Sequence, residues 1–165
     1  VISAIKLKKF FREYYDYPFV SFICAGEKFE INSTANKKFI KVDYLFYINN
    51  YHKFFEKLDC LNLNIINKEE YEIFDSNIHV GCEFVAWARL LKKYKKSLIL
   101  NEVGRKYYQD MKNQITKQNR RSRSNDFYYA YKSFYSEVNK YLNIKMKLRI
   151  KIRIYVYKIL MSIVV

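Results

Sequence analysis

The chain has 165 residues, of which half are hydrophobic, so it is long enough to bury the core of one domain. It carries 31 Lys and Arg against 16 Asp and Glu, and the resulting net charge of +15 indicates an anionic partner. The three cysteines, Cys24, Cys60 and Cys82, lie in apolar surroundings and fit reduced, buried thiols in the cytoplasm better than a disulfide framework or a zinc site.

The first quarter of the chain has one helical pattern followed by two strand patterns. Residues 2–15 place apolar side chains at helical spacing, and Pro18 is expected to end that helix. Residues 19–25 form a compact apolar run of strand length, and residues 27–32 alternate between apolar and polar side chains. We therefore expect a helix and then two strands.

The second quarter begins with an aromatic helical pattern. Tyrosines, phenylalanines, an isoleucine and a leucine recur every three or four residues over 43–58, which predicts a helix packed on a large surface. Residues 59–77 have a weak pattern and are expected to be irregular, with one helical turn at residues 68–72.

The segment 79–116 carries most of the functional argument. Glu83 stands in the first turn of an amphipathic helix, where the helix dipole and unpaired backbone N–H groups favour an ionised carboxylate. Residues 97–103 have the pattern of a short buried strand, which Gly104 is expected to end. A polar, aromatic loop follows from Arg105 to Asp110, beyond the strand end where open α/β sheets bind ligands.

This segment resembles the C-terminal part of the catalytic domain of family-2, inverting glycosyltransferases of the GT-A fold. In that family an acidic pair opens a helix of the type x-x-x-W-x-R-L-L, and a strand ending near Asn-Glu and a polar loop follow. The residues that match are Cys82-Glu83, Trp87, Arg89, Leu90, Leu91, Asn101-Glu102 and the loop from Tyr107 through Asp110 to Asn113. The sequence departs from the family in keeping one acid of the pair and in placing Asp110 where the loop histidine would be.

The resemblance implies a fold and a reaction. The fold would be α/β, a partial GT-A-like sheet with flanking helices, followed by a basic, mainly helical tail. The reaction would transfer a sugar from a nucleotide-sugar donor to a glycan or lipid-linked acceptor in cell-surface polysaccharide synthesis, with Glu83 as the general base.

The other site residues follow from the same resemblance and from their place in the segment. Substrate contacts are expected from Arg105, Lys106, Tyr108, Trp87 and His79, and a contact to a divalent metal, Mg or Mn, from Asp110. The ordinary interpretations are that Glu83 is a dipole partner, that Trp87 is a core residue, that His79 lies in a loop or core, and that the cations are solvated.

The expected organisation places half of a catalytic domain at residues 1–116 and a basic aromatic tail at residues 117–165. The sequence contains no Asp-x-Asp and no Gly-rich phosphate loop. If the resemblance holds, the nucleotide-binding half with the main metal motif lies upstream, and the isolated chain is inactive.

The tail holds two thirds of the net charge. Between Lys117 and Lys158 there are twelve Lys or Arg and two acids, a net of +10. Ser124 is expected to cap a helix that runs to about Leu142 with one broad aromatic stripe. Residues 145–157 alternate between basic and apolar side chains with the period of a strand, whereas the resemblance implies a helix, which we prefer.

A basic tail with many aliphatic side chains suits an anionic membrane surface, and the resemblance places that surface at the inner face of the cell membrane. The side chains expected to add salt-insensitive burial there are Ile150, Ile154, Ile159, Leu160, Ile163 and Val164. The alternative is a nucleic-acid-binding module, favoured by a pI near 9.6, by the segment 117–123 and by tyrosines able to stack on bases. No nucleic-acid-binding motif is present, so nucleic acid is not the expected partner. A purely structural fragment stays open.

Overall fold

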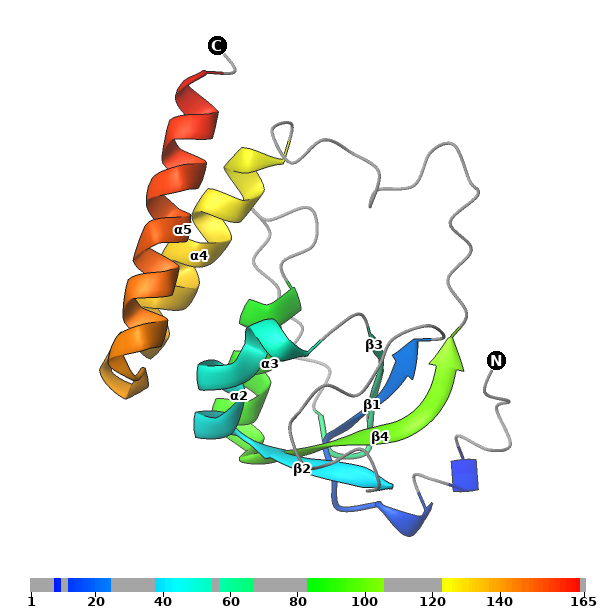
Figure 1. The fold of residues 1–165 in the computed structure, drawn as a ribbon. Coiled ribbons are helices and arrows are strands. Elements are labelled where there is room, and N and C mark those ends of the chain that lie inside the picture. Colours follow the sequence, from blue (N-terminus) through cyan, green and yellow to red (C-terminus); the bar gives the residue numbers. More distant parts are fainter. Residues whose placement is uncertain are drawn as a thin grey trace, which may run out of the picture. The chain divides into compact units, whose positions relative to one another are not determined.

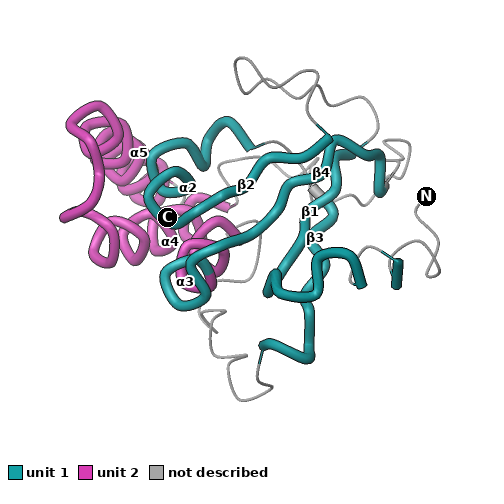
Figure 2. Tube along the Cα trace, turned by 90° about the horizontal axis from the view of Figure 1, so that it is seen from below, with its two compact units in different colours: residues 1–71, 91–108 teal, residues 72–90, 109–165 magenta. Residues whose placement is uncertain are grey.

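The structure is a computed structural model, and it describes residues 8–9, 12–24, 38–54, 57–66, 83–105 and 123–163 (Figure 1). The chain divides into two compact units, shown in different colours in Figure 2. Unit 1 comprises residues 1–71 and 91–108, and unit 2 comprises residues 72–90 and 109–165. Unit 1 contains a sheet and unit 2 is helical in its described part, so the α/β class predicted from the sequence is confirmed.

Unit 1 is built on a four-stranded mixed sheet. Its strands are β1 (Phe19–Cys24), β2 (Phe39–Asp43), β3 (Lys57–Leu61) and β4 (Lys96–Arg105). They lie in the order β2-β4-β1-β3. The central strands β1 and β4 are parallel, while β3 pairs with β1 and β2 pairs with β4 in antiparallel fashion. The two central strands therefore end at the same edge of the sheet.

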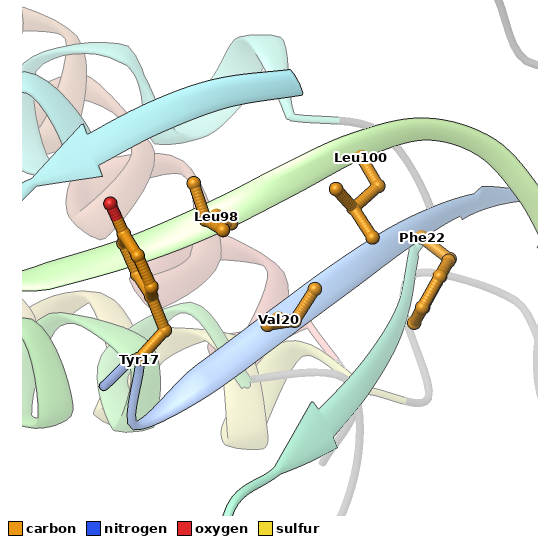
Figure 3. Packing of buried hydrophobic residues seen from close by; sticks show 5 residues of the cluster. All are labelled: Tyr17, Val20, Phe22, Leu98 and Leu100. Atoms are coloured by element: carbon orange, nitrogen blue, oxygen red, sulfur yellow. The ribbon is translucent and has the colours of Figure 1, made fainter. Parts of the chain in front are cut away.

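One hydrophobic cluster of the unit 1 core lies against one face of this sheet. Figure 3 shows its five buried residues: Tyr17, Val20, Phe22, Leu98 and Leu100. Side chains at every second position of β1 and β4 point to this face. The intervening residues Phe19, Ser21, Ser97 and Ile99 are buried as well. Burial on both faces explains why β1 reads as a continuous apolar run rather than as an alternating one.

Gly104 lies inside β4, so the prediction that it ends the strand is wrong. A Cβ atom at Gly104 would lie 2.4 Å from the Cβ of Phe22, a distance that only glycine avoids. The pairing of β1 with β4 is irregular next to this point, because Ile23 faces Val103 and Cys24 faces Arg105. The missing side chain thus lets two backbones approach at an irregular part of the parallel pair.

The helix predicted over residues 43–58 is only partly correct. Helix α2 (Tyr44–Asn50) begins after Asp43, whose carboxylate accepts a hydrogen bond of 2.8 Å from the N–H of Phe46, and the short 3-10 helix η1 (Tyr51–Lys53) follows. Residues 57–61 instead form β3, paired with β1. Leu58, the last apolar residue of the predicted helix, is partly buried against the core through strand pairing, which a local helical period does not reveal.

The described residues of unit 2 form the first part of one helix and all of two other α-helices. Helix α3 (Glu83–Tyr94) contributes its residues up to Leu90, and its last residues belong to unit 1. Helices α4 (Ser124–Val138) and α5 (Ile144–Ser162) run side by side, joined through the 3-10 helix η4 (Asn139–Tyr141) (Figure 1). The helix predicted from Glu83 and the mainly helical tail are both confirmed.

Two details of the tail differ from the sequence patterns. Arg123, and not Ser124, occupies the cap position of α4, and Ser124 is the first helical residue. Residues 145–157 are helical, so their strand-like alternation was misleading. Helix α5 begins at a true cap, because the side chain of Asn143 accepts a hydrogen bond of 2.9 Å from the N–H of Met146.

Some predictions concern residues that the structure does not describe. The strand at residues 27–32, the helical turn at residues 68–72 and Cys82 lie outside the described part. Cys24 and Cys60 are free thiols, the first buried and the second half-buried. Of the helices in the described ranges, none is both long and apolar enough to cross a membrane.

Candidate functional site

Glu83 is the first residue of α3, and its side chain is exposed. The next residue, Phe84, packs its ring on two rings of α4, with centroid distances of 5.0 Å to Tyr131 and 5.2 Å to Phe134. This contact anchors the first turn of α3 within unit 2. The carboxylate consequently stands at a fixed helix start, where the helix dipole and unpaired N–H groups stabilise negative charge.

The rest of α3 shows why this sequence forms a helix there. Its buried residues are Val85, Ala86, Trp87, Ala88, Leu90 and Leu91. Lys92 and Lys93, near the end of the helix, are exposed and favour the negative end of the dipole. Trp87 is only 7% exposed, the environment of a packing residue, and its contact with a substrate stays a prediction.

Arg89 makes a contact that the sequence did not reveal. The helical pattern predicts an outward-facing cation, but the guanidinium pairs with Glu137 of α4, with 2.9 Å from Nε and 2.5 Å from Nη2 to Oε1. Nη2 also donates to Oγ of Ser133 at 3.1 Å. The signal in the sequence was Glu137 itself, one of two acids in a strongly basic tail. This fork joins α3 to α4 one and a half turns beyond Glu83.

Helix α3 leads almost directly into β4. Lys95 alone connects them, with a left-handed backbone (φ 70°), and its N–H donates to the carbonyl oxygen of Leu91 at 2.9 Å. Strand β4 then runs beside β1 to Arg105, which is paired with Cys24. Arg105 is thus at the carboxyl end of two parallel strands, where open α/β sheets bind ligands.

The remaining predicted site residues are not brought together within the described residues. Lys106, Tyr108, His79 and Asp110 lie outside the described ranges. Glu83 belongs to unit 2 and Arg105 to unit 1, so it stays a prediction that Glu83, Arg105 and Asp110 act on one substrate. Within the described segments no three His, Cys, Asp or Glu side chains gather as metal ligands, and the metal contact of Asp110 also stays a prediction.

A polar contact inside the sheet escaped the sequence analysis. The buried hydroxyl of Ser21 on β1 donates to the carboxylate of Asp59 on β3, its cross-strand partner. Burial, with a smaller contribution from the charge of Asp59, raises the pKa of the neighbouring Cys60 thiol. Cys60 is therefore a weak nucleophile, and nothing in this cluster resembles an activated cysteine.

Charged and aromatic side chains also lie close together at the beginning of β4 and just before β1. The ammonium of Lys96 pairs with the carboxylate of Asp16 and lies 4.8 Å from the ring centre of Tyr17. The hydrogen bond from Lys96 lowers the pKa of Asp16. Burial raises the pKa of Tyr14, and the neighbouring carboxylate of Glu13 adds to that effect.

The tyrosines of the tail pack on one another. Rings of α4 and α5 stack in a layer, with centroid distances of 5.0 Å between Phe127 and Tyr157 and 5.8 Å between Tyr131 and Tyr157. Arg153 of α5 donates a hydrogen bond of 2.6 Å to the hydroxyl of Tyr131. These rings are core residues of the α4–α5 pair, as the ordinary interpretation of the aromatic stripe expects.

Comparison with protein-family models, with curated proteins and with solved structures finds no match to this chain.

Proposed function

We propose that the chain is the C-terminal part of a nucleotide-sugar-dependent, inverting glycosyltransferase with a GT-A-like catalytic domain. The proposal starts from the residue pattern of segment 79–116. The observation that supports it best is the continuous unit from Glu83 through α3 into β4, with an exposed carboxylate at its start and Arg105 at its end. The same order of acid, helix, strand and loop carries the resemblance.

In this proposal Glu83 removes the proton from the acceptor hydroxyl as that oxygen attacks the anomeric carbon of the donor. The bond between the anomeric carbon and the nucleoside diphosphate breaks on the opposite side, so the configuration inverts. Arg105 and the loop after it would contact the departing diphosphate. A divalent metal, where bound, would neutralise that diphosphate, and Asp110 is the residue of this chain proposed to contact it.

The arrangement of the first turn of α3 suits a general base better than a residue that serves only as a dipole partner. Phe84 and Arg89 fasten both ends of this stretch to α4. A side chain held on a rigid element keeps its orientation towards a substrate. For stability alone, an exposed acid at a helix start needs no such support.

The nucleic-acid alternative has weaker support. It requires aromatic faces that are open to bases, along a basic groove. In α4 and α5 the rings of Phe127, Tyr131 and Tyr157 are stacked on each other, which leaves little of their faces for bases.

The test is the substitution Glu83→Gln in a protein that also carries the Asp-x-Asp-containing region. Loss of the base should lower the transfer rate by about two to four orders of magnitude, because general base catalysis contributes that much. Donor binding, measured separately by titration, should change little. The 165-residue chain alone should transfer no sugar, since its sequence contains no Asp-x-Asp.

Asp126→Asn is the matched control, since Asp126 is the acid in the first turn of α4. Both substitutions remove a favourable dipole contact of about 0.3–1 kcal/mol. They should therefore lower stability by similar amounts, while Asp126→Asn keeps full activity. Equal turnover of the Glu83→Gln enzyme and the parent would refute the proposal.

A further inference from the structure

Helix α5 has a second apolar face that is exposed. Its residues are Ile144, Leu148, Ile152, Tyr155, Val156 and Ile159, with 41–86% of each side chain accessible. They recur every three or four residues, and at 100° per residue they cover an arc of about 120° along roughly four and a half turns. Exposed apolar residues scattered singly are ordinary, but a continuous stripe marks an interaction surface. We call this set the α5 stripe.

The α5 stripe does not contribute to the packing of α5 on α4. That packing uses Met146, Ile150 and Tyr157, which are buried and lie on a different side of the helix. Ile150 is fully buried, so the expectation that it joins a lipid-facing surface is wrong. Two apolar faces separated by basic residues also explain the strand-like alternation of this segment.

Cations border the α5 stripe on both sides. At 100° per residue, Lys147, Lys151 and Lys158 lie along one edge; Arg149 lies just beyond the other edge, and Lys145 lies close to that edge in the first turn. Between Ile144 and Ser162 there are six Lys or Arg and no Asp or Glu. An aliphatic centre with cationic borders is the arrangement of a helix that lies in a membrane interface.

We propose that the α5 stripe is a docking surface for an anionic lipid bilayer, with α5 parallel to the membrane plane. The aliphatic side chains would insert among the acyl chains, and the bordering cations would contact the anionic headgroups. The charges argue against a second copy of the chain, because two all-cationic helices repel each other. Tyr155 is the single aromatic residue of the α5 stripe, and one ring is not the series of rings on which successive nucleic-acid bases stack.

The first experiment measures binding of the 165-residue chain to vesicles of phosphatidylcholine with about one quarter phosphatidylglycerol, a composition that supplies negative surface charge. The variant Leu148→Ser/Ile152→Ser removes two side chains that are 61% and 53% exposed. Vesicle affinity should fall about 30- to 100-fold, because these side chains no longer insert. The parent should bind pure phosphatidylcholine only weakly.

The matched control is Leu45→Ser/Leu63→Ser. These two leucines are each 54% exposed and lie outside α5, so the same apolar loss is made elsewhere. The control should bind vesicles like the parent, and circular dichroism should show that both variants keep their helices. If the two double variants lose affinity equally, or if neither loses any, the α5 stripe is not the docking surface.

The second experiment tests the cationic borders. Lys145→Gln/Lys158→Gln should weaken binding about 10- to 30-fold, since each cation near an anionic surface contributes about a factor of five. Lys53→Gln/Lys92→Gln makes the same charge change at exposed positions outside α5 and should have a small effect. Added salt should weaken binding of the parent without abolishing it, because insertion does not depend on charge.

A fluorescent probe locates the inserted face. Tyr155→Trp places an indole on the α5 stripe, and Tyr129→Trp places one at an exposed position of α4. Brominated lipids should quench the added emission of the first variant and leave that of the second unchanged. Equal quenching of both would overturn the proposed orientation.

Three other results would overturn the proposal. They are tight, saturable oligonucleotide binding without vesicle binding, self-association that Leu148→Ser/Ile152→Ser abolishes, and vesicle binding that the same variant retains. None of these measurements involves sugar transfer. Failure here therefore leaves the role proposed for Glu83 untouched, and the reverse also holds.

Discussion

The two units differ in where their Lys and Arg side chains lie relative to the hydrophobic core. In unit 1 the core includes an apolar cluster on the sheet, to which Tyr17 and Leu100 belong. The ion pair between Lys96 and Asp16 is about half exposed to solvent. Cations lie over aromatic rings in both units, as Lys96 does over Tyr17, but in unit 2 Arg123 and Arg153 lie over rings that are stacked between α4 and α5. Arg123 lies 4.9 Å from the ring centre of Phe127, and Arg153 lies 5.4 Å from that of Tyr131. Aromatic faces thus accommodate positive charge that an aliphatic core would exclude.

The largest expected effects come from truncating one fully buried phenylalanine in each unit. Phe22→Ala in unit 1 and Phe134→Ala in unit 2 each remove a side chain with no exposed surface. Each should lower the free energy of unfolding by about 3–5 kcal/mol through lost burial and a residual cavity. Hydrogen exchange should show the loss of protection chiefly in β1, β3 and β4 for the first variant and in α4 and α5 for the second.

Exposed residues of matched size give the control for that comparison. Tyr15→Ala and Tyr129→Ala truncate residues that are 73% and 46% exposed, one in each unit, and should change stability by less than about 1 kcal/mol. If Phe22→Ala removed protection equally from both units, the division into two compact cores would not describe the energetics of the chain.

The two described ion pairs should differ in how much they contribute to stability, and the larger of the two contributions is expected in unit 2. Arg89 and Glu137 of unit 2 keep 25% and 30% of their side chains exposed and form a two-pronged contact. A double-mutant cycle with Arg89→Ala and Glu137→Ala should give a coupling energy of about 1–2 kcal/mol, measured by denaturant unfolding. Arg89→Lys should recover only part of it, because an ammonium cannot donate through a planar fork. A coupling energy near zero would mean that this contact does not hold α3 to α4.

The smallest effect concerns Lys96 and Asp16 of unit 1, which are both well exposed. The pKa of Asp16 is lowered from 3.8 in the folded chain, so the unfolded chain binds more protons in this range. The contribution of the pair to stability is therefore present above pH 3.8 and is lost as the pH falls through the folded pKa.

Stability measured from neutral pH down to the acid limit should show this loss in the parent. Both Asp16→Asn and Lys96→Gln should make the acid slope shallower, since the first removes the titrating group and the second removes the cause of its pKa shift. An unchanged slope in both variants would show that the contact contributes nothing in solution.

The sequence predicted correctly those elements whose own apolar residues show which side chains become buried. The helix from Glu83 turns a regular set of side chains inward, and the strands at residues 19–25 and 97–103 are apolar runs of strand length, so the local pattern identified all three. Strand β3 was missed because Leu58 ends the helical pattern of residues 43–58, the residues after it have a weak pattern, and the strand forms by pairing with β1, about forty residues earlier. For the candidate site, the sequence predicted only the order of acid, helix, strand and loop along the chain. The spatial neighbours of Glu83 and Arg105 depend on residues far away in the sequence, which local patterns do not reveal.

The sequence by itself determined the charge of the tail, the α/β class and the placement of Glu83 at a helix start. Composition and short-range spacing carry those properties, and folding does not alter them. The tertiary structure decided that residues 144–162 are helical, that Ile150 packs on α4 and that Leu148 is exposed. Alternating basic and apolar residues satisfy a strand and a two-faced helix equally well. The contact with α4 selects the helix, because it buries Met146, Ile150 and Tyr157 together on one side.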